Sequence, residues 1–237
     1  ANGAGSANTA GSINSTVSAS ATSGFSIVSY TGTGANATVG HGLSSAPSMI
    51  IVKGRDFVDN WGVFHSSLGN NKKLKFNLTN AVVTTSESWN STSPTSSVFS
   101  VGIDGETNNN GSAMIAYCFS NVQGYSKFGS YVGNGNADGT FVYTGFKPAF
   151  ILIKRYDGAD TWTIYDNKRT GFNVDNNPLF ANATTTESTD DDLDILSNGF
   201  KIRRNSGRIN TSGGNQLYMA FAEAPLVGSN NVPTTAR

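Results

Sequence analysis

The chain has 237 residues, of which 37% are hydrophobic and 14% are charged, and its formal net charge at pH 7 is zero. It therefore lacks the excess of basic residues that binding to nucleic acid or to an anionic membrane normally needs. No apolar run approaches the length of a membrane span, and the single cysteine, Cys118, excludes a disulfide within the chain. The length fits two compact domains of about 100 residues each.

The N-terminal segment, residues 1–22, consists almost entirely of Ala, Gly, Ser, Asn and Thr. With one Ile and one Val, it cannot bury enough apolar surface to fold by itself. Two interpretations stay open: a flexible leader, or an extended arm that becomes ordered against a neighbouring subunit. In both, residues 1–22 form a polar arm outside the folded domains.

From residue 23 onward, short apolar runs separated by turn residues predict β-strands. Met49–Val52 is apolar on both faces, which is typical of a central strand, whereas Leu74–Leu78 alternates and should expose one face to water. Nothing resembles an amphipathic helix of three or more turns. The strands expected in this half of the chain are Phe25–Tyr30, Ala37–Val39, Met49–Lys53, Trp61–His65, Leu74–Leu78, Val98–Val101 and Ala113–Phe119.

The second half repeats the first. Pro47–Lys53 returns as Pro148–Lys154 and Asp59–Phe64 returns as Asp160–Tyr165, at an offset of 101 residues. Near the end the offset becomes 104, which makes Ala222 the counterpart of Cys118. The strands expected here are Ser126–Val132, Thr140–Tyr143, Phe150–Arg155, Trp162–Tyr165, Leu179–Ala181, Phe200–Arg203 and Gln216–Phe221.

A period near 100 residues indicates a duplicated domain, because it is too long for the unit of a solenoid. The sequence thus predicts an all-β protein of two tandem, jelly-roll-like β-sandwich modules with about seven strands each. The first module covers residues 23–121, and the second covers residues 122–237 and ends in a C-terminal tail. Trp61 and Trp162 are expected to occupy equivalent core positions.

The residues that could carry chemistry are few. His41 and His65 are the only histidines, and no nucleophile elbow surrounds any serine, so we expect no catalytic residues. Cys118 lies in an apolar run, and its counterpart is Ala, which favours a buried and inert thiol.

One loop of the second half is acidic. It contains Asp190, Asp191, Asp192 and Asp194, with Glu187 nearby, and such carboxylates are the ligands that Ca²⁺ prefers. The spacing is not that of an EF-hand. The alternative is a solvated loop whose charge is balanced by the basic stretch Lys201, Arg203, Arg204 and Arg208. We expect no cofactor and keep Ca²⁺ as the alternative at this loop.

Trp89 has no counterpart in the repeat and lies in a polar stretch, Ser86–Ser91. An unpaired Trp in a polar loop is a candidate for stacking on a sugar or for anchoring a protein contact. It could also fold back over the edge of the sandwich.

Several motifs resemble a known family. Gly24–Gly34, Val39–Leu43, Pro47–Lys53, Ser93–Ser100, Ile115–Phe119, Gly124–Tyr131, Phe141–Phe146, Ser197–Ile202 and Tyr218–Glu223 are together similar to a domain of unknown function common in bacteriophages of marine bacteria and cyanobacteria. The resemblance runs from about Gly24 to Arg237. It implies a virion structural protein, often encoded among tail, fibre or head-appendage genes, and it brings no catalytic residues.

The expected function is therefore a non-enzymatic virion component at the surface of the phage particle. A receptor-binding tail fibre or spike and a capsid decoration (cement) protein are both open, and a carbohydrate-active β-sandwich enzyme is the less favoured alternative. The expected partners are other virion proteins, further copies of the chain in a symmetric oligomer, and a host surface glycan. Nucleic acid and membrane insertion are not expected.

Overall fold

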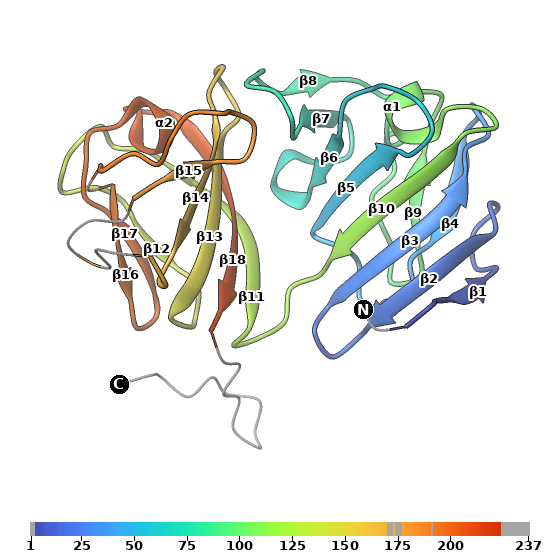
Figure 1. Ribbon diagram of the computed structural model, residues 1–237, viewed down its shortest axis with the longest axis horizontal. Coiled ribbons are helices and arrows are strands. Elements are labelled where there is room, and N and C mark those ends of the chain that lie inside the picture. Colours follow the sequence, from blue (N-terminus) through green and yellow to red (C-terminus); the bar gives the residue numbers. More distant parts are fainter. Residues whose placement is uncertain (1–2, 170–172, 174–176, 191, 224–237) are drawn as a thin grey trace. The chain divides into compact units, whose positions relative to one another are not determined.

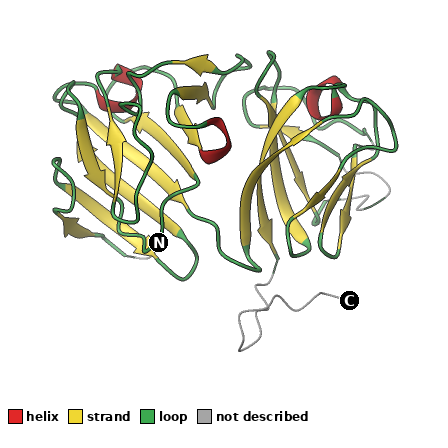
Figure 2. Cartoon of the chain, turned by 180° about the vertical axis from the view of Figure 1, so that it is seen from behind, coloured by secondary structure: helices red, strands yellow, loops and turns green. Residues whose placement is uncertain are grey.

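The computed structural model of the chain describes residues 3–169, 173, 177–190 and 192–223 (Figure 1). Strands dominate it, and its described helices are two single-turn α-helices and one 3-10 turn (Figure 2). None of these helices is long and apolar enough to cross a membrane. The chain divides into two compact units. Unit 1 contains Ala1–Asn77 and Val82–Asn121, and unit 2 contains Val122–Arg237 together with the short segment Leu78–Ala81.

Unit 1 is built around an eight-stranded sheet in the order β1-β2-β3-β10-β5-β6-β7-β8 and a two-stranded sheet, β4-β9. A 3-10 turn, η1 (Ser66–Leu68), and a short helix, α1 (Gly105–Asn108), interrupt the strands. The strands are β1 (Ser6–Asn8), β2 (Ser15–Ser20), β3 (Phe25–Thr31), β4 (Ala37–Gly40), β5 (Met49–Gly54), β6 (Gly62–His65), β7 (Lys72–Lys75), β8 (Val83–Thr84), β9 (Val98–Val101) and β10 (Ala113–Phe119).

The core of unit 1 lies between these two sheets. Alternate residues of β3, β5 and β10 point into it, and they meet Val39 of β4 and Phe99 of β9, which are both completely buried. The period of two residues along each strand produces this inward face. Cys118 belongs to it, and burial raises the pKa of its thiol to about 12, so the predicted burial is confirmed.

The prediction of an arm at residues 1–22 was wrong for the described residues. Strand β2 pairs antiparallel with β3 from Ser15↔Tyr30 to Ser20↔Phe25, and β1 pairs with β2. Ile13 and Val17 are both buried in the core of unit 1. A segment too polar to fold alone needs only these two anchors because the edge of β3 supplies partners for its backbone. We call residues 3–20 the leader.

The leader also covers the small sheet of unit 1. Ile13 forms a parallel bridge with Val39, and its N–H donates to the Thr38 carbonyl at 2.9 Å. The Ser15 hydroxyl donates to the Gly40 carbonyl at 2.9 Å. Gly40 makes room for the leader, because a Cβ at this position would lie 2.0 Å from Oδ1 of Asn8. The leader therefore closes the same edge of both sheets.

We expect Val17→Asp to lower the free energy of unfolding of unit 1 by about 3 kcal/mol, because it places an unpaired charge in the core. Thr16→Asp is the matched control, since Thr16 is exposed on the same strand, and its effect should stay within about 0.5 kcal/mol. Urea unfolding combined with hydrogen exchange of unit 1 measures both. Equal effects of the two variants would show that the leader is not part of the folded unit.

Unit 2 has a five-stranded sheet in the order β11-β18-β13-β14-β15 and a three-stranded sheet in the order β12-β17-β16. Its core lies between the two sheets and includes Ile151, Phe200 and Ala220. The elements are β11 (Ser126–Val132), β12 (Phe141–Tyr143), β13 (Pro148–Arg155), β14 (Trp162–Asp166), β15 (Leu179–Phe180), β16 (Leu193–Leu196), β17 (Gly199–Ile202), α2 (Gly207–Asn210) and β18 (Asn215–Ala222).

Strand pairing corrects the offset expected at the end of the repeat. Phe119 pairs with Phe25 and Met49, whereas Phe221 pairs with Ser126 and Phe150. The offset of β10 to β18 is therefore 102 residues, which makes Ala220 the counterpart of Cys118. Matching residue types alone misplaced the pair, because Ala220-Phe221 resembles Ala116-Tyr117 although the two pairs lie two residues out of register.

The two tryptophans have related backbone contacts but different burial. The N–H of Trp61 donates to Oδ1 of Asn77 at 3.0 Å, and that of Trp162 donates to Oδ1 of Asn182 at 2.8 Å. Trp162 is completely buried, whereas Trp61 is half-buried. The expectation of equivalent core positions thus holds for the backbone and fails for the side chains.

Candidate functional site

A buried asparagine organises the loops around the short helix of each unit. In unit 1, Nδ2 of Asn108 donates to the carbonyls of Gly102 and Ala35, at 2.7 Å each, and its Oδ1 accepts from the Thr33 N–H at 2.8 Å. The Tyr30 hydroxyl donates to the carbonyl of Thr107 beside it. One side chain therefore joins two loops, the one between β3 and β4 and the one between β9 and α1.

Asn210 does the same in unit 2. Its Nδ2 donates to the carbonyls of Asn136 at 2.7 Å and Arg204 at 2.9 Å, and its Oδ1 accepts from the Asn134 N–H at 3.0 Å. The Tyr131 hydroxyl donates to the Ile209 carbonyl at 2.8 Å. We call Asn108 and Asn210 the asparagine anchors.

Beside its anchor, unit 1 holds a buried cluster of opposite charges. Lys73 forms ion pairs with Asp104 and Glu106, and Lys75 pairs with Glu106 at 2.9 Å. Burial disfavours the charged carboxylates, but hydrogen bonds from Lys73 outweigh it and hold the pKa values of Asp104 and Glu106 below their usual range. Each charge in the cluster is thus compensated by another.

Unit 2 has a corresponding cluster with the signs exchanged. Where α1 carries Glu106, α2 carries Arg208, whose Nη2 lies 2.7 Å from Asp192 and 2.9 Å from Asp190. Asp192 is completely buried and also accepts a hydrogen bond from the Tyr165 hydroxyl at 2.6 Å. The guanidinium of Arg208 lies 5.4 Å from the centre of the Phe180 ring. The loop carboxylates are therefore held by the helix.

The acidic loop does not fit a metal site in the described residues. Asp190 pairs with Arg204 and Arg208, and Asp194 pairs with Arg203 at 3.2 Å. No cluster of His, Cys, Asp and Glu in the described part of the chain is arranged to hold a metal ion, and a cation would have to displace guanidinium groups. The alternative interpretation, balance by the basic stretch, holds for the three arginines, while Lys201 pairs with Asp138 at 2.7 Å. Asp191 lies outside the described residues.

Trp89 is not a surface anchor, which corrects that prediction. Its side chain is only 1% exposed, its Nε1–H donates to the Lys72 carbonyl at 3.1 Å, and its ring packs edge-on against Phe64. Asn90 and Ser91 adopt positive φ angles directly after it and turn the chain back. The polar residues around Trp89 therefore belong to a tight turn that directs the indole into the core.

Both histidines are buried and bonded to the backbone. Nδ1 of His41 accepts from the Leu43 N–H and its Nε2 lies 3.1 Å from the Thr95 carbonyl, while Nδ1 of His65 accepts from the Ser67 N–H. Burial lowers the pKa of His41, which favours the neutral ring. These contacts give the two rings structural roles in their loops.

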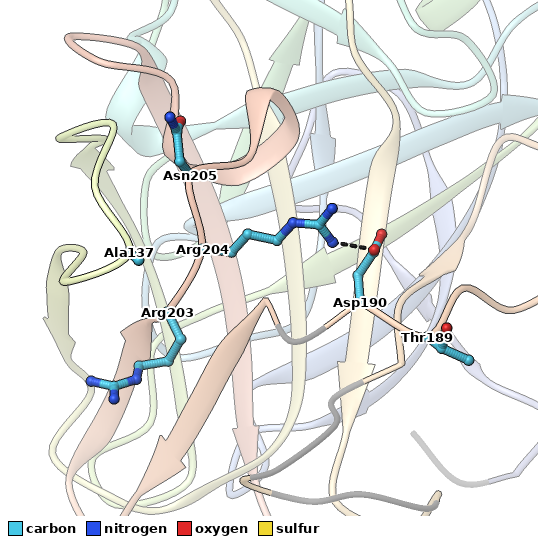
Figure 3. Close-up of a pocket in the computed structure, with 6 residues that line it drawn as sticks. All are labelled: Ala137, Thr189, Asp190, Arg203, Arg204 and Asn205. Atoms are coloured by element: carbon cyan, nitrogen blue, oxygen red, sulfur yellow. Dashed lines mark ion pairs between the residues drawn. The ribbon is translucent and has the colours of Figure 1, made fainter.

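An open groove lies beside the acidic loop of unit 2 (Figure 3). Its volume is about 380 Å³, and the side chains of Arg203 and Arg204 are 47% and 45% exposed. Arg204 points toward Asp190, whereas Arg203 points away from it (Figure 3). The other lining residues are Ala137, Thr189 and Asn205. Guanidinium N–H groups in such a groove suit carboxylates, sulfates and sugar hydroxyls. We call it the arginine groove; sequence patterns indicated its charges but not its shape.

Lys154 is a buried lysine whose described hydrogen-bond partners are backbone carbonyls. Its Nζ donates to Thr79 at 3.0 Å and to Asp160 at 2.7 Å, and both acceptors belong to unit 2. Burial lowers the pKa of Lys154 to about 8. Its counterpart Lys53 is half-buried and lies over the Phe57 ring, so the two lysines share a position but not an environment.

We expect the contribution of Lys154 to the stability of the protein to rise with pH above 8. In the unfolded chain lysine keeps its ordinary pKa, so between about 8 and 10.5 the unfolded state binds more protons than the folded state. The gain is at most about 1.4 kcal/mol per pH unit. In the same range the thiol of Cys118 ionises in the unfolded chain but not in the folded one, which lowers the stability of both proteins equally. Urea unfolding between pH 7.5 and 9.5 should therefore show the stability of the wild type rising relative to that of Lys154→Met. Parallel profiles for the two proteins would contradict it.

A family model described as "Domain of unknown function (DUF7483)" matches residues 1–225. No curated protein matches the chain, and neither does any solved structure. The match includes the leader, which the structure places inside unit 1.

Proposed function

The chain belongs to the family described as domain of unknown function DUF7483, and we propose that it is a non-enzymatic structural component at the surface of a bacteriophage particle. The phage assignment rests on the sequence motifs that resemble phage virion proteins. The all-β fold agrees with it, since such a fold provides rigid scaffolds with loops at both ends. Fold alone does not assign a function.

The observation that carries the proposal is the use the molecule makes of its reactive side chains. The two histidines bond to backbone groups, Cys118 is buried, and the described aspartates of the acidic loop, Asp190, Asp192 and Asp194, are paired with arginines. These groups hold loops in place instead of pointing at a common reacting centre. A protein whose polar side chains hold its loops in place is suited to be a rigid component of a particle.

We further propose that the two units arose by tandem duplication as jelly-roll-like sandwiches. The asparagine anchors, the tyrosine hydroxyls beside them and the strand order around β10 and β18 recur in both units. The charge cluster has exchanged signs, and the leader belongs to unit 1. Units that keep their frame while changing such charges and edges are typical of duplicated scaffolds adapted to different partners.

For contact with the host we propose the arginine groove of unit 2 and an acidic surface glycan. Arg203 is the best probe, because it is half-exposed and its pairing with Asp194 is a surface contact. On an array of acidic polysaccharides, Arg203→Ala should weaken binding about tenfold, the effect of losing one charged hydrogen bond. Arg55→Ala, an exposed arginine of unit 1, is the control. Equal binding by both variants would remove the groove from the proposal.

Imaging of particles tests the function itself. The protein should be present in purified phage particles, and density for it should lie on their outside at symmetry-related positions. A location on tail fibres favours receptor binding, whereas a location on the shell favours capsid decoration. Absence from particles would refute the proposal. Hydrolysis of the bound polysaccharide by the purified chain would instead support the carbohydrate-active enzyme.

A further inference from the structure

Strand β11 of unit 2 is an unusual edge strand. It has seven residues and ends the five-stranded sheet, whereas the other terminal strands in the described part of the chain have two to four residues. A long edge offers backbone groups to which a further strand can add, and proteins usually block it with charges, prolines or bulges. β11 has no proline and one charge, Lys127, which lies 5.8 Å from the centre of the Tyr143 ring.

Unit 1 covers the corresponding edge with its leader. β3 corresponds to β11, because Tyr30 and Tyr131 make the same contact and both strands flank the strand that follows the short helix. In unit 1, β2 pairs with β3. Among the described residues of unit 2, β11 pairs with one strand, β18. Ser126 of β11 also forms a single bridge with Val122.

Apolar side chains are exposed along this edge of unit 2. Val132 is 54% exposed, Phe141 is 44% exposed and Tyr143 is 59% exposed. Thr140 donates to the Val132 carbonyl at 2.8 Å, and the contact of Lys127 with Tyr143 also joins the edges of β11 and β12. Half of the six large hydrophobic side chains that the described residues expose therefore gather beside one open edge, which is typical of an interaction site.

We propose that a second copy of this chain occupies this edge, so that β11 pairs antiparallel with its own copy across a two-fold axis through Gly129–Val132. A strand edge complements itself in such an arrangement, and a chain of zero net charge does not repel its copy. Antiparallel addition is also how β2 covers β3 in unit 1. The interface would join copies of the chain within an assembly, and in this respect it rests on the proposed function.

The leader of another copy fits this edge less well. Val39 pairs with Phe99 in unit 1, and Val142 pairs with Phe200 at the corresponding position of unit 2. In this register, Thr38 corresponds to Phe141, and Gly40 corresponds to Tyr143. The leader contacts Thr38 and Gly40 closely, and Gly40 leaves space that Asn8 fills. The two aromatic side chains of unit 2 take up that space.

Sedimentation equilibrium of the full chain tests the interface. The wild-type chain should dimerise, and the double variant Ser130→Lys/Val132→Lys should raise the dissociation constant at least about tenfold, since it brings like charges together along the shared edge. Both positions are exposed, so the fold should persist, which circular dichroism checks. Thr84→Lys, on the two-residue edge strand β8, is the control and should dimerise like the wild type.

Hydrogen exchange of the wild type gives a second readout that needs no variant. Amides of Ser130 and Val132, which alternate along β11 with those that face β18, should become protected as concentration rises, while those of the leader stay unchanged. A monomer at the highest soluble concentration, an oligomer that the double variant leaves intact, or loss of leader protection on association would each overturn the proposed interface. Each of these results is compatible with the presence of the protein in purified particles. Failure of the interface and failure of the proposed function are therefore distinguishable.

Discussion

Replacing Arg208 by Met should lower the free energy of unfolding of unit 2 by about 3–5 kcal/mol, the cost of breaking a buried ion pair by removing one partner. Arg208 is the helix residue that compensates Asp192, whose side chain is completely buried. The variant leaves this carboxylate with the Tyr165 hydroxyl as its close partner, since Nη1 of Arg204 lies 3.9 Å away. Methionine keeps the unbranched apolar stem of the side chain and removes the guanidinium with its contact to the Phe180 ring, so the loss reports the charge.

Two further variants identify the cause. Arg203→Met removes a guanidinium whose pair with Asp194 is solvent-exposed, and it should cost less than about 1 kcal/mol. Adding Asp192→Asn to Arg208→Met should recover part of the stability, because the uncompensated charge is then gone. Urea unfolding, with hydrogen exchange to assign the change to unit 2, measures all three. Equal costs for Arg208→Met and Arg203→Met would contradict the importance of burial here.

Sequence patterns predicted the all-β class and most strands because alternation and turn residues are local properties. The run Met49–Val52 lies in β5, where its residues are buried on both faces, and Phe150–Ile153 lies in β13. The acidic loop and the basic stretch were also visible as opposite charges. Their pairing required tertiary structure, since α2 brings Arg208 to Asp192 from outside the loop.

The arm at residues 1–22 was misjudged, and the two interpretations of Trp89 stayed open, for one shared reason. Composition averages over a segment, whereas burial depends on single side chains: Ile13 and Val17 anchor a polar segment, and Trp89 anchors a polar turn. A strand also needs less apolar surface when an existing sheet edge satisfies its backbone. In the leader, the spacing of Ile13, Ser15 and Val17 on alternate positions was a signal of a strand with one buried face.

Replacing either asparagine anchor should destabilise its own unit by about 3 kcal/mol. Asn108→Ala leaves the carbonyls of Gly102 and Ala35 and the N–H of Thr33 without their side-chain partner, in bonds that are buried at Gly102 and partly buried at the other two, and each lost bond costs about 1 kcal/mol. Asn108→Asp should be at least as harmful, because it turns a carboxylate oxygen toward two carbonyls. Asn110→Ala, at an exposed neighbouring position, is the control and should cost less than about 0.5 kcal/mol.

The two anchors also allow a test across units, since Asn210 makes the corresponding contacts in unit 2. The N–H of Gly34 donates to the Asn108 carbonyl, so its hydrogen exchange should accelerate in Asn108→Ala. The N–H of Gly135 donates to the Asn210 carbonyl, so its hydrogen exchange should accelerate in Asn210→Ala. Each variant should leave the other glycine unchanged. If Asn108→Ala lowered the free energy of unfolding by no more than Asn110→Ala does, water would have to replace the lost hydrogen bonds. The complete burial of both asparagines argues against that, because water must first open the loops that the anchors close.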